Sequence, residues 1–278
     1  MPGTVLMTRR RWITLLLVAA LAFAAGCGGE KAAGPATPAS GTPPAASPSA
    51  AAAATPGTPI PPSGIGADVP ANLFQNGGFE SGYAPWVPLT PQEGSVPPKV
   101  TSARAHSGKE AALLMLSATP EDTGSNVYGF VQELSPPAEF PEVISGYYRV
   151  EGWVRGAPKQ YLEFVVAAVG AKNIPGGHVN PQTRYVLAGV SEPPLDIPYV
   201  KYVFLSRQDP PTDQWVYFEV PIRKDFEEQW GAVPEGYEKL EVFFEARYDD
   251  KPAGAEASAN VFYDDLYIGP AQGDPNRP

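Results

Sequence analysis

The stretch NLFQNGGFE at residues 72–80, followed by Gly82 and Trp86, opens the part of the chain that is expected to fold. Its two adjacent glycines allow a positive φ or a close approach between backbones, and Phe79 supplies an apolar anchor. Glu80 follows directly, and a carboxylate beside a core position needs a partner if it is buried. The pattern predicts a turn-dense entry into a β-sheet.

Composition limits what the chain can do. It has 278 residues, and about 200 remain after the Pro- and Ala-rich N-terminal part, enough for one sizeable core. The formal net charge of −10 argues against nucleic acid as a partner and against direct docking to anionic lipid headgroups. A single cysteine excludes an intrachain disulfide framework and a cysteine-based zinc site, and two histidines argue against histidine-rich metal chemistry.

Residues 1–26 have the pattern of an export signal. The basic segment Thr8–Trp12 precedes the apolar run Ile13–Ala25, which is shorter than the ~20 residues that a membrane span needs. The string AAGC at residues 24–27 resembles the lipobox of bacterial lipoproteins, although that family usually has leucine three positions before the cysteine. The resemblance implies that Cys27 is lipidated and becomes the mature N-terminus. An ordinary signal peptide with an incidental cysteine is the alternative.

The composition of the next segment, residues 27–70, predicts a disordered tether. Residues 27–70 are mostly Ala, Pro, Gly, Ser and Thr, which cannot bury enough apolar surface to offset the entropy of ordering them. An extended Pro-rich chain of ~3.1 Å per residue would reach up to about 120 Å. We expect a disordered tether that holds a domain at 71–270, with a flexible tail at 271–278, away from a membrane. This places the protein in the cell envelope, facing the extracytoplasmic side.

The export route stays open at this stage. The string TRRRWI at residues 8–13 resembles a twin-arginine export signal, but a plain basic segment of a general secretory signal has the same letters.

From residue 71 onward, short apolar and aromatic runs alternate with clusters of Pro, Gly and Asp. This spacing is typical of an all-β protein, and we expect an antiparallel β-sandwich of the jelly-roll type with one short helix at 224–230. The expected strands are 111–117, 127–134, 147–155, 161–169, 185–188, 200–206, 215–222, 240–248 and 261–268.

Two of these strands carry an aromatic residue on their charged side, away from the core: Trp153 in the strand 147–155 and Phe243 in the strand 240–248. Aromatic planes stack on the apolar faces of sugar rings, while neighbouring polar side chains bond the hydroxyl groups. The alternation therefore predicts a carbohydrate-binding face, unless loops cover it and bury the aromatic rings. The side on which Gln132 points is open. The expected contact residues are Gln132, Arg149, Trp153, Phe243 and Arg247.

The last expected strand places a carboxylate among apolar side chains. Asp264 shares its parity with Phe262, Leu266 and Ile268, and such a carboxylate needs a cation or several hydrogen bonds. Glu80 poses the same problem at the other end of the domain. If the first and last strands are neighbours, both carboxylates could share calcium, which takes oxygen ligands in flexible geometry.

Loose matches over the whole domain carry a resemblance to carbohydrate-binding modules of families 4, 9 and 22, which are galactose-binding-like jelly rolls. The matching strings, in the family's order, are NGGFESG with a tryptophan at 76–86, AHSGKEAAL at 105–113, GFVQEL at 129–134, YYRVEGWVR at 147–155, WVYFEV at 215–220 and FYDDL at 262–266. The resemblance implies a polysaccharide or glycan ligand. It also implies a structural calcium held by Glu80, a backbone carbonyl near Gly108, and Asp264. The long Pro- and Gly-rich region 170–198 departs from the pattern and could shape or block a binding cleft.

Three functions are consistent with these observations. The leading hypothesis is a non-catalytic, lipid-anchored protein that binds a polysaccharide or glycan. An interaction or scaffold module that docks an envelope protein is the second, because outward aromatic residues and an acidic surface suit it equally. A polysaccharide lyase or glycosidase is the third, since carboxylate pairs such as Glu151 and Glu245 are present, although the sequence has no nucleophile elbow or histidine-containing metal motif.

Overall fold

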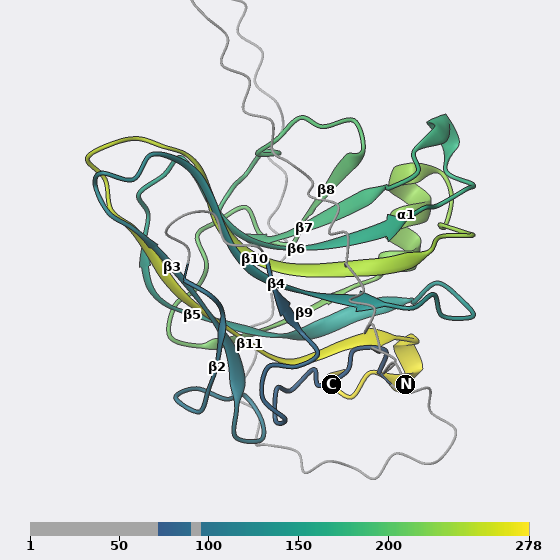
Figure 1. Ribbon diagram of the computed structural model, residues 1–278, viewed down its shortest axis with the longest axis horizontal. Helices are drawn as coiled ribbons and strands as arrows, with labels where there is room; N and C mark the ends of the chain where they lie inside the picture. Colours follow the sequence, from purple (N-terminus) through teal and green to yellow (C-terminus); the bar gives the residue numbers. More distant parts are fainter. Residues whose placement is uncertain (1–71, 90–95, 278) are drawn as a thin grey trace, which may run out of the picture. The chain divides into compact units, whose positions relative to one another are not determined.

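Two β-sheets pack face to face in the computed structural model, which describes residues 72–89 and 96–277 (Figure 1). Sheet A has the strand order β1 (Val87–Pro88), β4 (Gly124–Leu134), β10 (Lys239–Lys251), β6 (Lys159–Val169), β7 (Gln182–Ala188) and β8 (Val200–Phe204). Sheet B has the order β2 (Lys99–Thr101), β3 (Ala111–Ala118), β11 (Ala257–Gly269), β5 (Val143–Val154) and β9 (Trp215–Val220). The predicted all-β sandwich is confirmed. The predicted signal peptide, Cys27 and the tether lie outside the described residues.

One strand pair departs from the expected antiparallel arrangement. β7 and β8 run parallel, because the chain returns through residues 189–199 before it re-enters the sheet. This pairing places Arg184 of β7 directly beside Tyr202 of β8.

The helix α1 (Ile222–Trp230) begins two residues before the expected position and shortens the strand predicted at 215–222. Pro221 cannot donate to the sheet ladder, so β9 ends before it. Ile222, Phe226 and Trp230 recur every fourth residue, and all three are buried. Gly231, with a φ of 77°, ends the helix in the left-handed conformation. Among the described residues, no helix has the length and apolar character to cross a membrane.

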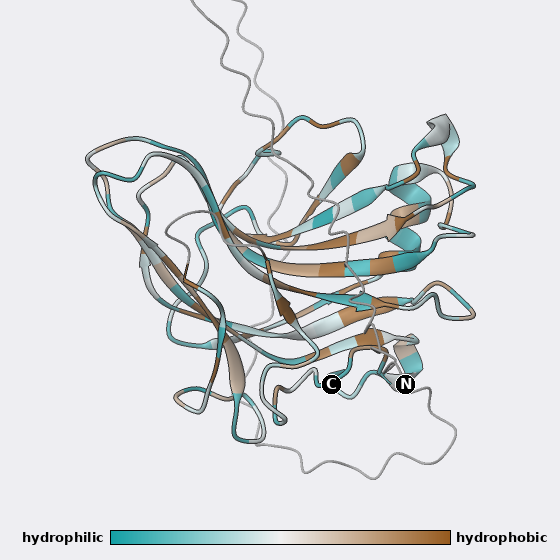
Figure 2. Cartoon of the chain, viewed as in Figure 1, coloured by the Kyte–Doolittle hydropathy of each residue, from teal (hydrophilic) through white to brown (hydrophobic). Residues whose placement is uncertain are grey.

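The core between the sheets is rich in aromatic rings. Phe244 of β10 lies 5.4 Å from Phe130 and 5.6 Å from Phe164 in the neighbouring strands, and 5.2 Å from Tyr263 of sheet B. Each such pair contributes about 0.5–1.5 kcal/mol beyond the burial of its surface. Figure 2 shows the alternation of apolar and polar residues along the strands that produces this core.

A β-bulge in β5 reverses the faces of the residues that follow it. Gly152 has a φ of +62°, and the register between β5 and β11 shifts at this point. As a result, Trp153 packs against the core, while Val154 is 48% exposed. The expectation that Trp153 projects away from the core is therefore wrong, because strict alternation does not continue through a bulge.

The opening stretch lies along the last strand, as the sequence suggested for the two ends of the domain. The Leu73 N–H donates to the Ile268 carbonyl at 2.9 Å, and the Leu266 N–H donates to the Gly77 carbonyl at 3.0 Å. A Cβ atom on Gly77 would lie 2.1 Å from the Leu266 carbonyl oxygen, so this close approach requires glycine. Phe79 is fully buried. β1 itself pairs with β4 rather than with the last strand.

The C-terminal segment is held in place up to Arg277, although a flexible tail was expected from 271. The Asn276 side-chain amide donates to the Asp265 carbonyl at 2.7 Å, and the Arg277 guanidinium forms an ion pair with Glu219.

Candidate functional site

The structure divides the predicted carbohydrate contacts between the two sheets. Arg149 and Trp153 belong to β5 of sheet B, whereas Phe243 and Arg247 belong to β10 of sheet A. Gln132 points inward and fastens the opening stretch, because its amide exchanges two hydrogen bonds of 2.8 and 3.0 Å with the Gln75 backbone. The five residues therefore do not form one surface.

The carboxylate pair considered for catalysis is also separated. Glu151 lies in sheet B, where Arg104 and Arg149 both bond its Oε1 atom, at 2.6 and 2.8 Å. Glu245 lies in sheet A. A glycosidase needs both carboxyl groups at one glycosidic bond, so this pair cannot serve.

Five charged side chains instead gather where β6, β10 and β7 lie side by side. The core contains the even-numbered residues of β10 from Leu240 to Tyr248, so its odd-numbered residues point away from sheet B. We call that side the outer face of sheet A. The charged cluster on it consists of Glu163, Arg184, Glu245, Arg247 and Asp249.

Most of the charges in this cluster are paired. Arg184 Nη1 donates to Glu163 Oε1 at 2.6 Å and lies 3.7 Å from Glu245 Oε2. Arg247 bonds both oxygens of Asp249, at 3.0 and 3.2 Å, and its Nη1 donates to Glu245 Oε2 at 3.3 Å. Because a buried ion is costly without compensation, this pairing makes the burial of so many charges possible. The donors of Arg247 are thus occupied within the protein.

Three polar atoms at the cluster are buried without a hydrogen-bond partner among the described residues. They are Glu163 Oε2, Arg184 Nε and the hydroxyl oxygen of Tyr202. A buried polar group that lacks its partner costs about 1–3 kcal/mol. Three such atoms in one place indicate that a partner from outside the fold, such as a ligand or ordered water, completes them.

Tyr202 connects the charged cluster with a pocket of about 330 Å³ at the edge of sheet A. The end of the 170–198 region supplies part of its wall, with Pro193, Leu195 and Ile197. The rings of Tyr202 and Phe204 lie 6.3 Å apart at an angle of 28°, which gives the strand a half-buried aromatic surface. Small-molecule sites have volumes of about 300–1,000 Å³. We call Glu163, Arg184, Tyr202 and Glu245, with this pocket, the Arg184 site.

The electrostatics of the Arg184 site centre on Glu163. Burial raises the pKa of Glu163 to about 7, an effect to which the charge of Glu245 adds and which Arg184 and Arg247 oppose. Burial also raises the pKa of Tyr202 to about 12, so its hydroxyl group is protonated at neutral pH. The site thus offers an arginine donor, a tyrosine hydroxyl and a carboxyl group that changes charge near neutrality.

The carboxylates predicted to hold calcium both bind the loop 106–110. Glu80 Oε1 accepts the N–H groups of Lys109 and Glu110 at 2.6 and 2.9 Å. Asp264 Oδ2 accepts those of His106 and Ser107 at 2.7 and 3.2 Å. The predicted parity of Asp264 is wrong, since a bulge follows it, but its predicted burial is confirmed, because the residue is fully inaccessible.

Asp264 is a buried carboxylate. Burial, with the nearby charge of Asp265, raises the pKa of Asp264 to about 7, against the effect of its backbone hydrogen bonds. Within the described residues, no ion pair compensates Asp264 and no group of three or more His, Cys, Asp or Glu side chains surrounds a common point. Backbone N–H groups of the loop contact both carboxylates, Glu80 through Lys109 and Glu110 and Asp264 through His106 and Ser107.

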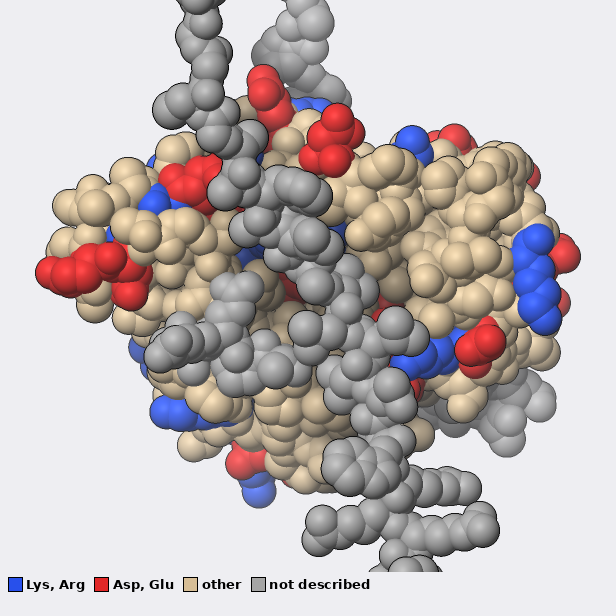
Figure 3. All heavy atoms as spheres, turned by 45° about the horizontal axis from the view of Figure 1, so that its top comes forward, with Lys and Arg blue, Asp and Glu red and all other residues tan. Residues whose placement is uncertain are grey.

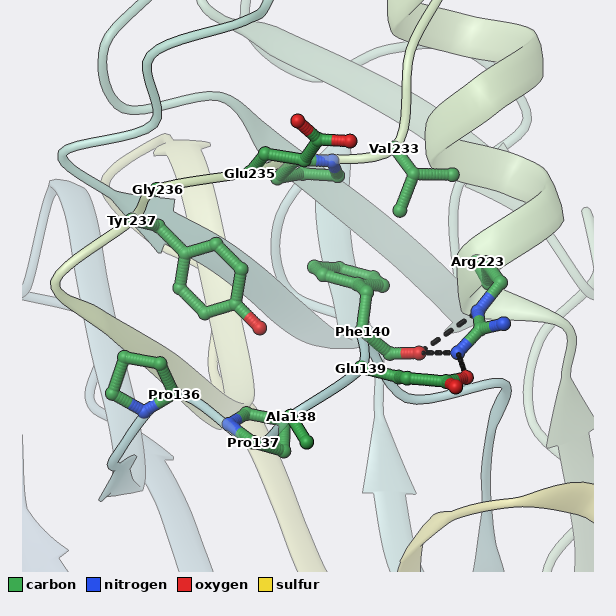
Figure 4. A pocket seen from close by; sticks show the side chains of 11 residues that line it. Pro136, Pro137, Ala138, Glu139, Phe140, Arg223, Val233, Glu235, Gly236 and Tyr237 are labelled. Carbon is green, nitrogen blue, oxygen red and sulfur yellow. Dashed lines mark hydrogen bonds and ion pairs between the residues drawn. The ribbon is translucent and has the colours of Figure 1, made fainter.

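A second pocket, of about 480 Å³, lies between the loops before β5 and before β10 (Figure 4). Three prolines with Phe140 and Tyr237 line much of it. Its arginine, Arg223, is already engaged, since it donates to the Phe140 carbonyl and to Glu139 at 3.1 Å. This pocket therefore presents a mostly apolar wall without the unpartnered polar atoms of the Arg184 site.

Sequence reasoning missed Arg184 and Glu163. The strand expected at 185–188 began too late to include Arg184, which precedes it in β7. Glu163 carried a signal, because it is a lone acid in the otherwise apolar run YLEFVV at residues 161–166. Read by alternation, that acid faces the side opposite Leu162 and Phe164.

Comparisons with known proteins identify neighbours in fold. Neither a scan against protein-family models nor a search of curated proteins found a match. Among solved structures, a family 61 carbohydrate-binding module in complex with β-1,4-galactotriose is 15% identical, with 72% of this chain and 98% of that chain covered and a TM-score of 0.38. The C-terminal family 22 module of Clostridium thermocellum Xyn10B is 15% identical, with 70% and 94% covered and a TM-score of 0.36.

An enzyme domain is among the same neighbours. The enzymatically active domain of tailspike protein 4 from bacteriophage CBA120 is 11% identical, with 71% of this chain and 21% of that chain covered and a TM-score of 0.38. Likenesses at this level leave the ligand of this chain to be argued from its own residues.

Proposed function

We propose that this protein is a non-catalytic carbohydrate-binding protein whose ligand occupies the Arg184 site on the outer face of sheet A. The observation that carries the proposal is the convergence of three buried polar atoms, on Glu163, Arg184 and Tyr202, that have no partner within the described part of the chain and lie beside a pocket with an aromatic wall. A ligand that completes these atoms must offer both hydrogen-bond donors and acceptors.

Sugar hydroxyl groups meet this requirement, because each can donate one hydrogen bond and accept others. A hydroxyl oxygen would accept from Arg184 Nε, while a hydroxyl hydrogen would be donated to Glu163 Oε2. The half-exposed ring of Tyr202 would pack against the apolar face of the sugar. Since the arginines of the cluster are already paired with carboxylates, the site suits a neutral hydroxylated ligand better than an acidic one.

The rest of the proposal concerns how the domain is presented. We infer that residues 1–26 are removed, that Cys27 is lipidated, and that the tether holds the domain off the membrane in the cell envelope. What supports this is the resemblance of residues 24–27 to a lipobox and the low-complexity composition of residues 27–70. A calcium ion bound by Glu80, Asp264 and loop carbonyl groups would fasten the two ends of the domain.

Binding to immobilised neutral polysaccharides, including xylan and β-1,4-galactan, tests the proposed function. Tyr202→Ala should weaken binding about tenfold or more, since losing about 1.4 kcal/mol corresponds to a factor of ten. Tyr199→Ala is the matched control, because Tyr199 is exposed on the same segment and does not line the pocket. Trp153→Ala should lower the melting temperature without changing affinity, because Trp153 packs against the core.

Two results would contradict the proposal. One is that no polysaccharide binds the folded protein, a result that would favour docking of an envelope protein. The other is that Tyr199→Ala and Tyr202→Ala reduce binding equally.

A further inference from the structure

Glu163 and Glu245 are direct cross-strand neighbours in the antiparallel pair of β6 and β10. Side chains in such positions lie close together, and like charges there repel each other. Each carboxylate is contacted by the same two arginines: Nη1 of Arg184 lies 2.6 and 3.7 Å from them, and Nη1 of Arg247 lies 3.8 and 3.3 Å from them. The two acids therefore form a buried pair that both Arg184 and Arg247 contact.

The charges around this pair do not balance when every acid is ionised. Asp249, on β10, is a third carboxylate of the cluster, so three negative charges face the two positive charges of Arg184 and Arg247. The Tyr161 hydroxyl of β6 donates to Asp249 at 2.9 Å. The neutral Tyr202 hydroxyl faces the pair from β8, and Tyr263 of β11 lies on its core side. One proton on the pair would make the cluster neutral. Glu163 is its natural position, since Glu163 is fully buried and its Oε2 atom has no partner among the described residues.

We propose that ligand binding at the Arg184 site is coupled to the release of a proton from Glu163, so that affinity rises with pH through neutrality. This inference rests on the proposed function. In the protonated state, the Glu163 O–H group donates to Glu245, and Oε2 can no longer accept a hydrogen bond from a ligand. In the ionised state, Glu163 forms a full salt bridge with Arg184 through Oε1, and its Oε2 can accept a hydrogen bond from the ligand. The proton passes to solvent, and no other group changes charge.

Glu163 is thus a positioning residue for Arg184 as well as an acceptor for the ligand. Its salt bridge fixes Nη1 of Arg184, which leaves Nε of the same guanidinium unpartnered and able to donate to a ligand oxygen. Protonation of Glu163 weakens its salt bridge with Arg184, and it also removes the oxygen that accepts a hydrogen bond from the ligand. Both effects act in the same direction on affinity.

The two consequences of this titration have opposite signs. With a pKa of about 7 for Glu163, the ionised fraction rises about tenfold between pH 6 and pH 8, and the apparent Kd falls by the same factor. The free protein behaves in the reverse way, because its folded state holds the proton more tightly than the unfolded chain. Its stability should fall as pH rises from the ordinary pKa of glutamate, about 4.3, through about 7.

The test is calorimetric titration of the protein with xylan and with β-1,4-galactotriose at pH 6, 7 and 8, in two buffers of different ionisation enthalpy. The wild type should bind about tenfold more tightly at pH 8 than at pH 6 and release up to one proton. Glu163→Gln, which imitates the protonated carboxyl group, should bind at the weak, low-pH level at every pH. Glu241→Gln, on the same face of β10 but paired with Lys239, should keep the wild-type profile.

Binding with a Kd that does not depend on pH, or a Glu163→Gln variant that keeps the pH profile, would overturn the coupling while leaving the proposed function intact. If neither probe binds at any pH, the proposed function is wrong. The pH dependence of the melting temperature still tests whether Glu163 holds a proton in the free protein. The melting temperature should fall between pH 5 and pH 8 more steeply in the wild type than in Glu163→Gln, and identical slopes would overturn the inference.

Discussion

At the scale of single residues, two buried acids stand out because their pKa values are raised far above those of ordinary carboxyl groups. Glu163 and Asp264 both have a pKa raised to about 7, in each case first by burial. Glu163 has arginine partners and one oxygen, Oε2, without a partner among the described residues, which suits a ligand site. Asp264 holds a loop through backbone N–H groups, which suits a role in the structure of the domain. Burial acts alike on both, but their neighbours differ.

The first prediction concerns calcium. Adding calcium to protein treated with EDTA should raise the melting temperature, because an ion that binds only the folded state stabilises it by about 2.7 kcal/mol at a hundredfold excess over its Kd. The effect should shrink below about pH 7, where Asp264 is protonated and cannot bind the ion. Differential scanning calorimetry at pH 6 and pH 8 measures both.

The matched variants for calcium are Asp264→Asn and Asp265→Asn. Asp264→Asn should abolish the response to calcium, whereas Asp265→Asn, which removes the neighbouring charge, should retain it in part. A melting curve that calcium leaves unchanged at pH 8 would rule out the ion.

Single residues were predicted with uneven success, for physical reasons. The need of Asp264 for partners was visible, because a buried acid next to apolar residues has few solutions, but Glu80, for which the same need was expected, is exposed. Gln132 could not be placed, because the contact it makes with Gln75 depends on how two distant segments meet. Arg184 gains its importance only from neighbours on three other strands, and the sequence does not show which strands are adjacent.

At the scale of elements, two β-bulges decide which side chains face outward. The bulge at Gly152 turns Trp153 toward the core, and the one at Asp265, with a φ of 51°, returns Leu266 and Ile268 to it. Alternation predicted the strands well, since it reflects burial on one side. It could not locate the bulges, because an inserted residue changes the parity without altering the composition. The predicted carbohydrate-binding face was therefore wrong at Trp153, which packs against the core.

The second prediction separates backbone strain from steric overlap at two glycines of this region. Gly152→Ala should cost about 1 kcal/mol, since the residue has a φ of +62° but no atom within 4 Å of an added Cβ. Gly156→Ala should cost about 3 kcal/mol or more, because its Cβ would lie 2.1 Å from the Glu256 carbonyl oxygen. Urea unfolding measures both, and equal losses would contradict the bulge geometry.

At the scale of the whole molecule, the outer faces of the two sheets carry different groups of residues. The outer side of sheet B is crossed by the loop that contains Arg104 and His106, which contacts Glu151 and stacks on Tyr147 at 3.6 Å. The outer face of sheet A carries the charged cluster and the adjoining pocket. Figure 3 shows acidic and basic side chains scattered over one side of the domain without a large area of one sign.

The third prediction concerns attachment to the membrane. Cys27→Ser should move the protein from the membrane fraction to the soluble fraction, because the only cysteine would no longer be available for lipidation. Metabolic labelling with a palmitate analogue provides the direct readout. Labelling that survives the substitution, or a variant that stays with the membrane, would contradict the lipid anchor.

The most direct test of the central claim is to map the ligand on the domain by NMR. On titration with a soluble neutral polysaccharide that binds the protein, we predict that the largest amide shifts fall in β6, β7 and β8 around Glu163, Arg184 and Tyr202, with smaller ones at Glu245. Shifts centred instead on Arg149 and Trp215 of sheet B would show that the carbohydrate-binding surface has been assigned to the wrong face.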